Sequence, residues 1–529
     1  MKPPMLPWGG HFYHVPHSGS FRPALPPLNS RGPAALPSIS TQDTRAVASA
    51  SAVKVTPFRK TRVDPAGRPS AGPSQRAIAS AITASLPKRA RARATDLTLF
   101  TLLTSFATMI FTLRPLLWLS VLIGLSASVR ADNPSSAPAM VNVSDPILVA
   151  EGPAVERRWG RYQFPTLDRL LDGRIALSFH INEDSARAYG TTPAQPNRGV
   201  SNDGGKTWTL EHATTRTAGL LLPNGDRIIA GRSDVTPPAI PVRELSLPAP
   251  VGTLIGTYGN LPYTFYPHDA LPESLQGVPL VRLPAGKNQW MTERAALLDP
   301  GFQRYTIQDV FPVVWWGDVS LAADGSTLAV VYPRSLDGDV ACHRSTDHGR
   351  SWHLQGRIAY EPDPQADPKA HARTQGFTEP GTVILADGSL LVVLRTTDGL
   401  GSGPLYASRS SDQGKTWSKP TVVNDYGVMP RLLRLDNGVL VLSYGRPGAA
   451  MRFSFDGTGS KWSEPVDLVP VRSDDIQGDS CGYTSLLPLS ADSFLIAYSW
   501  FKRPGSDGQP RKALLVRHVT VGGTSPGAR

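Results

Sequence analysis

The sequence predicts an all-β protein folded as a six-bladed β-propeller, and two repeated patterns carry this prediction. The first is an octapeptide of the form S-x-D-x-G-x-T/S-W, which occurs at 201–208, 345–352 and 410–417. The second is a turn pair followed by an apolar run, which occurs six times. A unit of this size cannot bury both of its own faces, so six units are expected to stack radially. Helices should be few.

Each turn pair precedes a short apolar run, which is the local pattern of a tight β-hairpin. The run Val392–Leu394 suits a strand that is buried on both faces. The longest interval between turns holds a Pro-rich insertion around Thr236–Pro250, and we expect further loop up to Pro300. The six turn pairs are Asp172-Gly173, Asn224-Gly225, Asp324-Gly325, Asp387-Gly388, Asn437-Gly438 and Asp492-Ser493.

The octapeptides are interpreted as structural turns. Their Ser and Asp side chains can hydrogen-bond to the backbone of their own turn, and Gly tolerates a positive φ. The Trp offers a large apolar face that can pin the turn to neighbouring strands. A stretched copy occupies 454–462. None of these positions needs a ligand.

The N-terminal region differs from the rest in composition. Residues 1–96 are rich in Pro, Ser, Ala and Arg without apolar periodicity, so 1–108 is predicted to be a disordered or misassigned extension. From Met109 the sequence is typical of a secretory signal peptide over 109–131, with Arg114 before an apolar core and a Val-Arg-Ala end. The mature chain would then begin at Asp132.

A signal peptide predicts that the mature protein is secreted or periplasmic. The alternative is a membrane anchor over roughly 98–127, which is long enough to cross a bilayer. Arg114 near the middle of that segment argues against the anchor. We therefore expect no stable membrane insertion of the mature domain, 132–529, whose propeller core should cover about 150–505.

The charge distribution excludes a broad nucleic-acid surface on the folded part. The first 131 residues hold 16 of the 54 basic and 3 of the 43 acidic residues, which leaves 38 basic and 40 acidic residues in the remainder. A nearly neutral domain has no basic footprint for nucleic acid. Cys342 and Cys481 are the two cysteines, and either a disulfide or two buried thiols is compatible with the sequence.

Several segments of the chain resemble the sialidase (neuraminidase) superfamily over about 150–505. The octapeptides look like the Asp boxes of that family, and Tyr162-Gln-Phe-Pro-Thr-Leu167 looks like its first-blade Y-R-I-P-x-L motif. The segment from Glu379 to Arg395 resembles its central Glu-to-Arg segment. Gly482-Tyr483-Thr-Ser-Leu486 resembles the G-Y-S-x-L segment with the catalytic tyrosine.

The resemblance implies a glycosidase that acts on a glycan with a terminal acidic sugar. Tyr483 would be the nucleophile and Glu379 the group that takes its proton. The acid/base role would fall to an Asp after the second strand of the first blade, where Asp184 is the candidate. His180 follows the same strand and is expected near Asp184, where a chemistry other than that of sialidases could use it.

The family binds the substrate carboxylate with three arginines. Arg395 matches the second, and Arg446 is the best match to the third, with Arg452 as the fallback. The first is replaced by Gln163, and Arg161 lies two residues earlier on the same strand face. The motif therefore supplies one cation fewer for a sialate carboxylate than the family uses.

Two other functions remain open from the sequence. Gln163, His180 and His371 motivate a polysaccharide lyase acting on uronates, and a non-catalytic glycan-binding propeller is the third possibility. Trp315-Trp316 suits a sugar-stacking platform or a core anchor. No cluster has metal-ligand spacing, so neither a metal nor another cofactor is expected.

Overall fold

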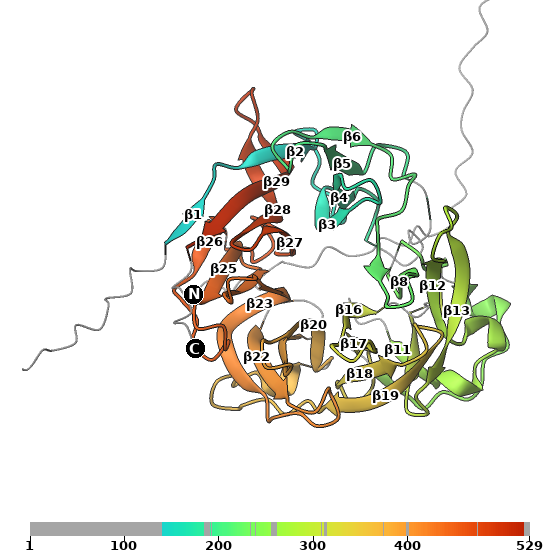
Figure 1. Ribbon diagram of the computed structural model, residues 1–529. Coiled ribbons are helices and arrows are strands. Elements are labelled where there is room, and N and C mark those ends of the chain that lie inside the picture. The colour runs from blue at the N-terminus through green and yellow to red at the C-terminus, as the bar shows by residue number, and fades with distance from the viewer. Residues whose placement is uncertain are drawn as a thin grey trace, which may run out of the picture. The chain divides into compact units, whose positions relative to one another are not determined.

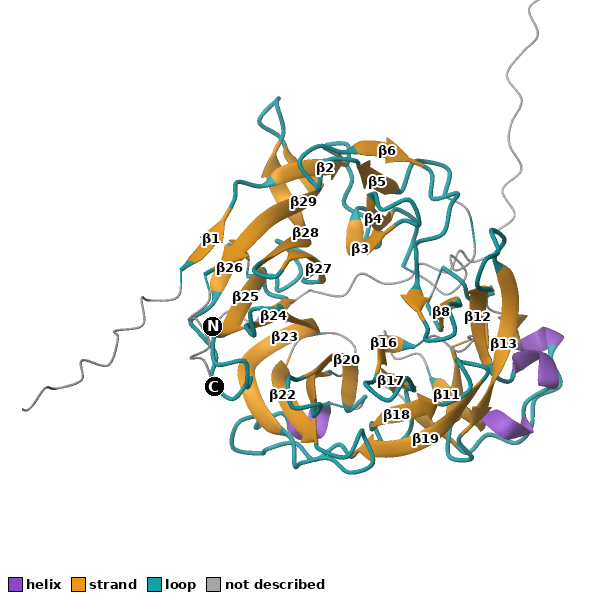
Figure 2. Cartoon of the chain, viewed as in Figure 1, coloured by secondary structure: helices purple, strands orange, loops and turns teal. Residues whose placement is uncertain are grey.

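The computed structural model describes residues 140–522, except 185–190, 192, 233, 238–239, 255–261, 308, 311–314, 374, 398–400, 402 and 473. The predicted extension and signal peptide, 1–131, lie outside the described residues. In the described part, no helix is long and apolar enough to cross a membrane. The helices described there are 3-10 turns of three residues each (Figure 2): η2 (Val242–Glu244), η4 (His268–Ala270), η5 (Glu273–Leu275) and η6 (Ala370–Ala372).

Six antiparallel blades surround a central axis, and their first strands face the centre (Figure 1). Blade one is β3 (Gln163–Arg169), β4 (Ile175–His180), β5 (Arg198–Ser201) and β6 (Thr209–Glu211). Blade two is β7 (Leu220–Leu221), β8 (Arg227–Ala230), β12 (Val278–Leu283) and β13 (Met291–Leu298). Blade three is β16 (Trp316–Leu321), β17 (Thr327–Tyr332), β18 (Val340–Ser345) and β19 (Ser351–Ile358).

Blades four and five share one long strand, β23 (Thr421–Arg434), whose first half pairs with β22 and whose second half pairs with β24. Blade four is β20 (Phe377–Ile384), β21 (Leu390–Thr396), β22 (Gly403–Ser410) and the start of β23. Blade five continues with β24 (Leu440–Gly445), β25 (Ala449–Ser454) and β26 (Val466–Val469).

Blade six takes strands from both ends of the described chain. It contains β27 (Thr484–Ser490), β28 (Ser493–Pro504) and β29 (Pro510–Val521), and β29 also pairs with β1 (Val141–Val143) and β2 (Ile147–Glu151). This closure joins the last blade to the start of the propeller. The sheets therefore extend beyond the expected core of 150–505, and the predicted six-bladed all-β fold is confirmed.

The six predicted turn pairs all lie between the first and second strands of their blades. The five glycines in these pairs have φ of 81° to 91°, which an L residue adopts only with strain. β21 is buried along its whole length, as predicted for Val392–Leu394. The repeated turn pair thus marks the hairpin between the first and second strands of each blade.

The octapeptides lie between the third and fourth strands of their blades, and their polar atoms bond within the turn. In the copy at 410–417, Ser410 donates to Asp412 at 2.8 Å and accepts from the amide of Gly414 at 2.7 Å. The Thr416 hydroxyl donates to Asp412 at 2.6 Å, and the indole N–H of Trp417 donates to the Gly414 carbonyl at 3.1 Å. The scaffold interpretation of these turns is confirmed.

The core lies between neighbouring blades, and the octapeptide tryptophans help to fill it. Trp352 of blade three is fully buried against Leu280 of blade two, and Trp417 of blade four packs against the cluster that holds Cys342 of blade three. Cys342 and Cys481 are both buried free thiols. They belong to different blades and do not form a disulfide.

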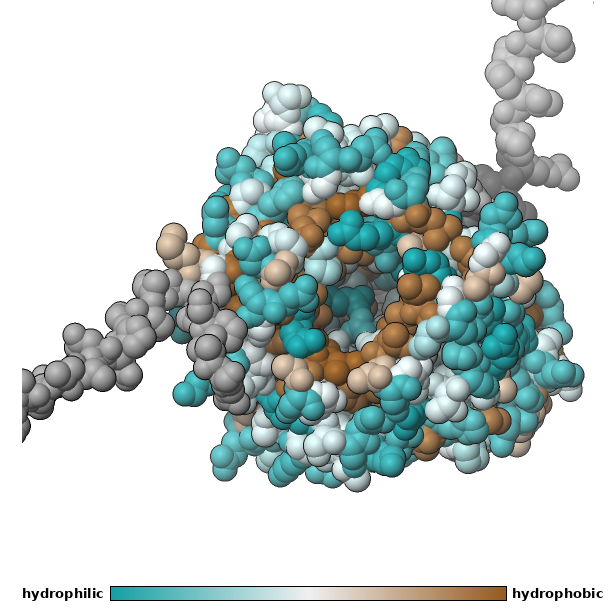
Figure 3. Space-filling model, viewed as in Figure 1, coloured by the Kyte–Doolittle hydropathy of each residue, from teal (hydrophilic) through white to brown (hydrophobic). Residues whose placement is uncertain are grey.

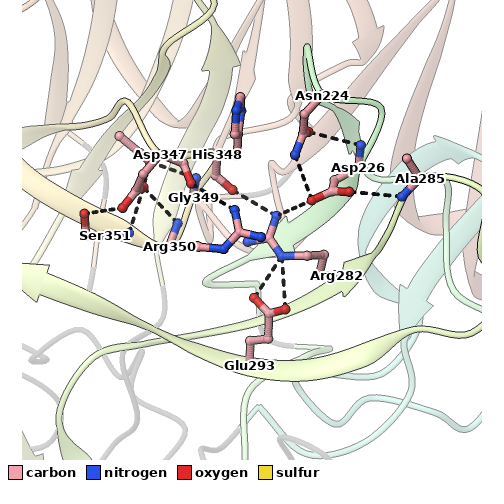
Figure 4. A network of polar contacts seen from close by, with 11 residues as sticks. Asn224, Asp226, Arg282, Ala285, Glu293, Asp347, His348, Gly349, Arg350 and Ser351 are labelled. Carbon is pink, nitrogen blue, oxygen red and sulfur yellow. Dashed lines mark hydrogen bonds and ion pairs between the residues drawn. The ribbon is translucent and has the colours of Figure 1, made fainter.

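Blades two and three are also joined by a buried arginine (Figure 4). Arg282 on β12 is 1% exposed; it donates to Glu293 at 2.9 Å and to Asp226 at 3.2 Å. Its other contact is the carbonyl of His348, in the octapeptide turn of blade three, at 3.0 Å. Nearby, β13 and β19 pair in parallel. Arg282 therefore holds the turn of one blade against the strands of the next.

The expectation of loop up to Pro300 was wrong. The outer strands of blade two, β12 and β13, lie in that interval. The chain leaves blade two after β8 and again after β13, and the two excursions form a separate five-stranded sheet. Frequent prolines masked the strand patterns there. The strands of this sheet are β9 (Ile240–Pro241), β10 (Gly252–Leu254), β11 (Tyr263–Pro267), β14 (Gln303–Ile307) and β15 (Asp309–Val310).

Candidate active site

The inner strands of blades one, four and five share a backbone feature near the point where each begins to pair within its blade. Phe164, Glu379 and Met429 each precede a proline and have φ of 54°, 46° and 43°. The strand register shifts at each of these places. A proline cannot donate to the strand ladder, and a bulge redirects the adjacent side chains. Each inner strand thereby aims one side chain away from the regular ladder.

Glu379 lies at the centre of the candidate site, where it is 5% exposed. Its Oε1 accepts hydrogen bonds from the hydroxyl of Tyr483 and from Nη1 of Arg395, the latter at 2.7 Å. Its Oε2 accepts from the backbone amide of Met429 at 2.9 Å. Three donors from three blades or their entry loops therefore fix both carboxylate oxygens.

These contacts set the protonation states of the pair. Burial alone would raise the pKa of Glu379, but the positive charge of Arg395 and the hydrogen bond from Tyr483 outweigh it, so this pKa lies below its ordinary value. Burial and the Glu379 charge raise the pKa of Tyr483 well above its ordinary value. The resting pair is a neutral phenol that donates to a carboxylate.

Two predicted arginines lie beside this pair, at or just after the ends of the second strands of blades four and five. Arg395 also donates to the carbonyl of Gly401 at 2.9 Å. Arg446 donates to the carbonyl of Cys481 at 2.9 Å, and its guanidinium carbon lies 5.7 Å from the ring centroid of Tyr483. Both side chains are about 5% exposed or less. The fallback, Arg452, instead bonds to the backbone of Ser463.

The structure does not bring a third arginine from the first-blade motif to this pair. Gln163 is fully buried and accepts from the Gly160 amide at 3.2 Å. Arg161 is 30% exposed and lies 3.8 Å from Glu156. Among the described residues, no contact joins Arg161 to Glu379 or Tyr483. Blade one contributes aromatic surface instead, because the Phe164 ring lies 4.9 Å from that of Tyr483.

Asp184 and His180 lie on the blade-one side of the site. The indole N–H of Trp159 donates to Oδ2 of Asp184 at 3.0 Å. His180 places Nδ1 3.2 Å from the Gly160 carbonyl, and its ring lies 5.7 Å from that of Phe164. Burial lowers the pKa of His180, and the nearby Asp184 opposes this shift. His180 is therefore neutral at ordinary pH.

Other sequence candidates lie elsewhere. His371 is exposed on η6, and its neighbour Arg373 pairs with Asp367 at 3.4 Å. Trp315 is 4% exposed and stacks on His343 in the core between blades two and three, so the core interpretation holds for it. Across the described ranges, no group of three or more His, Cys, Asp or Glu side chains is arranged to hold a metal ion.

Trp159 and the Met429 amide belong to the site but were not predicted from the sequence. The recurring residue-Pro pair at the starts of three inner strands was a usable signal for Met429. Trp159 belongs to a loop before blade one, at a position that no repeat marks. Only the fold shows that this loop reaches the candidate site.

Residues 314–494 match the family model of the BNR repeat-like domain. This match agrees with the six blades and the Asp-box turns described above. Over this segment the propeller is similar to BNR repeat-like domains. No match was found among the curated proteins.

Several solved structures are similar to this propeller. A protein of unknown function from Dyadobacter fermentans is 19% identical, with 72% of this chain and 99% of that chain covered and a TM-score of 0.49. A mutant NanB sialidase from Streptococcus pneumoniae is 14% identical, with coverages of 71% and 70% and a TM-score of 0.41. Trypanosoma rangeli sialidase is 14% identical, with coverages of 67% and 54% and a TM-score of 0.36. Function is therefore argued from the site.

Proposed function

We propose that the protein is a glycoside hydrolase of the sialidase type that releases a terminal acidic sugar, with sialic acid as the first substrate to test. One observation carries this proposal: the Tyr483 hydroxyl donates to the buried carboxylate of Glu379 while Arg395 and Arg446 flank the pair. A phenol with a partner for its proton and two cations nearby suits attack on an anionic sugar.

In the first step, the Tyr483 oxygen attacks the anomeric carbon, and its proton passes to Glu379. The glycosidic bond breaks, and Asp184 donates a proton to the departing oxygen. In the second step, Asp184 takes a proton from water, whose oxygen attacks the anomeric carbon. The Tyr483–sugar bond breaks, and Glu379 returns the proton to the phenolate. The sugar therefore leaves with retained configuration.

A tyrosine nucleophile fits an anionic substrate on electrostatic grounds. A carboxylate nucleophile would repel the negative charge of the sugar, whereas a neutral phenol does not, and sialidases depart from the two-carboxylate pattern in this way. The pKa of Tyr483 is raised, so free phenolate is scarce at neutral pH. Proton transfer to Glu379 during attack removes the need for it.

Substrate binding would depend chiefly on Arg446. Arg395 already shares its charge with Glu379 at 2.7 Å, whereas the guanidinium of Arg446 donates to a neutral carbonyl. Gln163 supplies no charge in place of the family's first arginine. One lost charge-assisted hydrogen bond is worth roughly 1.5–3 kcal/mol, so we expect weaker sialoside binding than a three-arginine site provides.

The test is turnover of a fluorogenic sialoside by the purified chain, with Tyr483→Phe as the matched variant. Turnover that is lost in the variant while the thermal melt is unchanged would support the proposal. Absence of turnover on sialosides and on other acidic glycosides would refute hydrolysis. Glycan binding that survives Tyr483→Phe without product release would instead indicate a binding propeller.

A polysaccharide lyase is the second candidate function. It is favoured by His180, which is neutral and lies beside Phe164 near the tyrosine, and by Gln163 in place of an arginine. A lyase would form an unsaturated uronate that absorbs in the near ultraviolet. Formation of such a product, dependent on His180, would replace the hydrolase proposal.

We also propose that the protein is exported after cleavage behind Ala131. The support is the signal-like sequence over 109–131. N-terminal sequencing of the secreted protein is expected to start at Asp132. Any other start would contradict this cleavage, and retention in the membrane would favour the anchor over 98–127.

A further inference from the structure

Trp159 contacts two groups of the candidate site that do not contact each other in the described structure. Its indole N–H donates to Oδ2 of Asp184 at 3.0 Å. Its ring faces the guanidinium of Arg446, with 5.2 Å between the ring centroid and Cζ. Its edge-to-face partner Phe164, at 6.0 Å, in turn contacts Tyr483 at 4.9 Å. Trp159 thus stands between Asp184 and the nucleophile side of the site.

The residue after Trp159 packs against the backbone of the same acidic loop. Gly160 has φ of 87°, and a Cβ at this position would stand 2.5 Å from the Asn182 carbonyl oxygen and from the Asp184 amide nitrogen. Only glycine allows this approach without displacing the loop. Side chain and backbone of the Trp159-Gly160 pair therefore both contact the segment that carries Asp184.

The other side of Trp159 is anchored in blade six. Phe501 meets the indole edge-on at 6.3 Å, and the ammonium of Lys512 lies 4.6 Å from the Phe501 ring centroid. Lys512, which is 4% exposed, also donates to the carbonyl of Arg158 at 2.6 Å. A buried lysine bonded to the preceding carbonyl holds the backbone of Trp159 in place.

We propose that Trp159 is a positioning residue that orients the carboxyl group of Asp184 for proton transfer to and from the glycosidic oxygen. This inference rests on the proposed hydrolase function. A carboxyl group on a loop has rotational freedom, and the fixed indole donor on Oδ2 restricts the directions in which this carboxyl group can face the substrate. General acid catalysis is effective only within hydrogen-bond reach of the departing oxygen.

Substrates with different leaving groups can distinguish a positioning role of Trp159 from a role in packing alone. A sugar alcohol is a poor leaving group and needs the proton from Asp184, whereas 4-methylumbelliferone departs with little assistance. General acid catalysis contributes typically 10²–10⁴-fold. Loss of orientation should therefore cost about 10–100-fold on a sugar leaving group and less than about threefold on the aryl glycoside.

The experiment compares kcat/KM of the full chain and of Trp159→Phe on a sialyl disaccharide and on the 4-methylumbelliferyl sialoside. Phenylalanine retains ring contact with Arg446 and Phe164 but has no N–H. Where Trp159→Phe lowers the melting temperature, benzothienylalanine at position 159 preserves the indole shape without the donor. Trp208→Phe, in an Asp box, is the matched control.

The expected result is a selective loss on the disaccharide for both position-159 variants and an unchanged ratio for the control. Asp184→Asn should show the same selectivity, and its combination with Trp159→Phe should add little, because residues acting through one group are not additive. Equal loss on both substrates, or additivity, would overturn the inference while the hydrolase function stands. Wild-type inactivity on both substrates would refute the function, and the inference with it.

Discussion

The hydroxyl of Tyr483 donates to Oε1 of Glu379 although 104 residues separate the two in the chain. The same oxygen accepts from Arg395, so one carboxylate atom receives both a neutral donor and a cation. Glu379 extends from the inner strand of blade four, and Tyr483 precedes the inner strand of blade six. The pair exists because the ring brings these strand starts to one end of the central axis.

Removal of either partner should abolish turnover with little effect on folding. Tyr483→Phe deletes the attacking oxygen, and Glu379→Gln deletes the proton acceptor; we expect kcat to fall by at least about 10³-fold in each. A fluorogenic glycoside assay with far-ultraviolet circular dichroism measures both effects. Comparable activity of Tyr483→Phe and the wild type would exclude the nucleophile.

In the pH profile of kcat/KM, the loss of activity on the acid side should occur below the ordinary glutamate pKa of about 4.3. Although burial opposes ionisation, Arg395 and the Tyr483 hydrogen bond lower the pKa of Glu379. The carboxylate is thus ionised above this lowered pKa, and activity is lost as pH falls through it. An acid limb near pH 6 that persists in Glu379→Asp would assign the limb to another group.

Arg446→Met should raise KM for an acidic glycoside more than it lowers kcat. The change removes a buried cation beside Tyr483, and one charge-assisted hydrogen bond is worth about 1.5–3 kcal/mol, which corresponds to about 10–100-fold in kcat/KM. Arg452→Met is the matched control, because its guanidinium bonds to Ser463 and Asn424 instead. A larger effect of the control would contradict the assignment.

Two glycines with the same backbone conformation should respond differently to alanine. At Gly438, with φ of 91°, a Cβ meets no atom within 4 Å, so Gly438→Ala should cost only the backbone strain of about 1–2 kcal/mol. At Gly414, with φ of 89°, a Cβ would stand 2.4 Å from Sγ of Cys342. Gly414→Ala should destabilise more in urea unfolding, and Cys342→Ala should restore part of the loss. Equal costs for the two glycines would show that the blade contact is loose.

The Asp-box aspartates should make the fold sensitive to strong acid. Hydrogen bonds from the side chain and amide of Thr416 and from Ser410 lower the pKa of Asp412 to about 2, whereas the unfolded value is about 3.9. A lowered folded pKa contributes stability above pH of about 4, and this contribution disappears as pH falls toward 2. Urea midpoints between pH 2 and pH 6 measure it. Asp412→Asn should flatten the dependence; an unchanged curve would contradict the assignment.

The sequence predicted the blades better than the site, for a physical reason. Local turn chemistry fixes the inner hairpins, so Asp387-Gly388 and its five counterparts could be located without any knowledge of tertiary contacts. The partners of Gln163 and Arg161 depend on where the backbone bulges at Phe164, which no local pattern specifies. The insertion sheet after blade two was missed because its pairing joins segments on either side of β12 and β13.

The space-filling view shows a hollow at the centre of one face, and both apolar and polar residues line this hollow (Figure 3). Around such a centre, the blades contribute residues of their two inner strands and of the loops beside them. A substitution in an outer strand, such as β19 or β26, can therefore change stability without touching the chemistry. Changes of specificity should concentrate at the strand entrances near Phe164 and Met429 and at Arg446, just after β24.

The pairing of β1 and β2 with β29 has a consequence for synthesis. Blade one leaves the ribosome first, but the ring of blades closes only when β29 has emerged and can pair with β1 and β2. A chain that stops before position 483 would already contain Asp184, Glu379 and both arginines, yet it would lack the nucleophile and an intact ring. The chemistry proposed for Tyr483 therefore cannot begin until the chain has been made through β29.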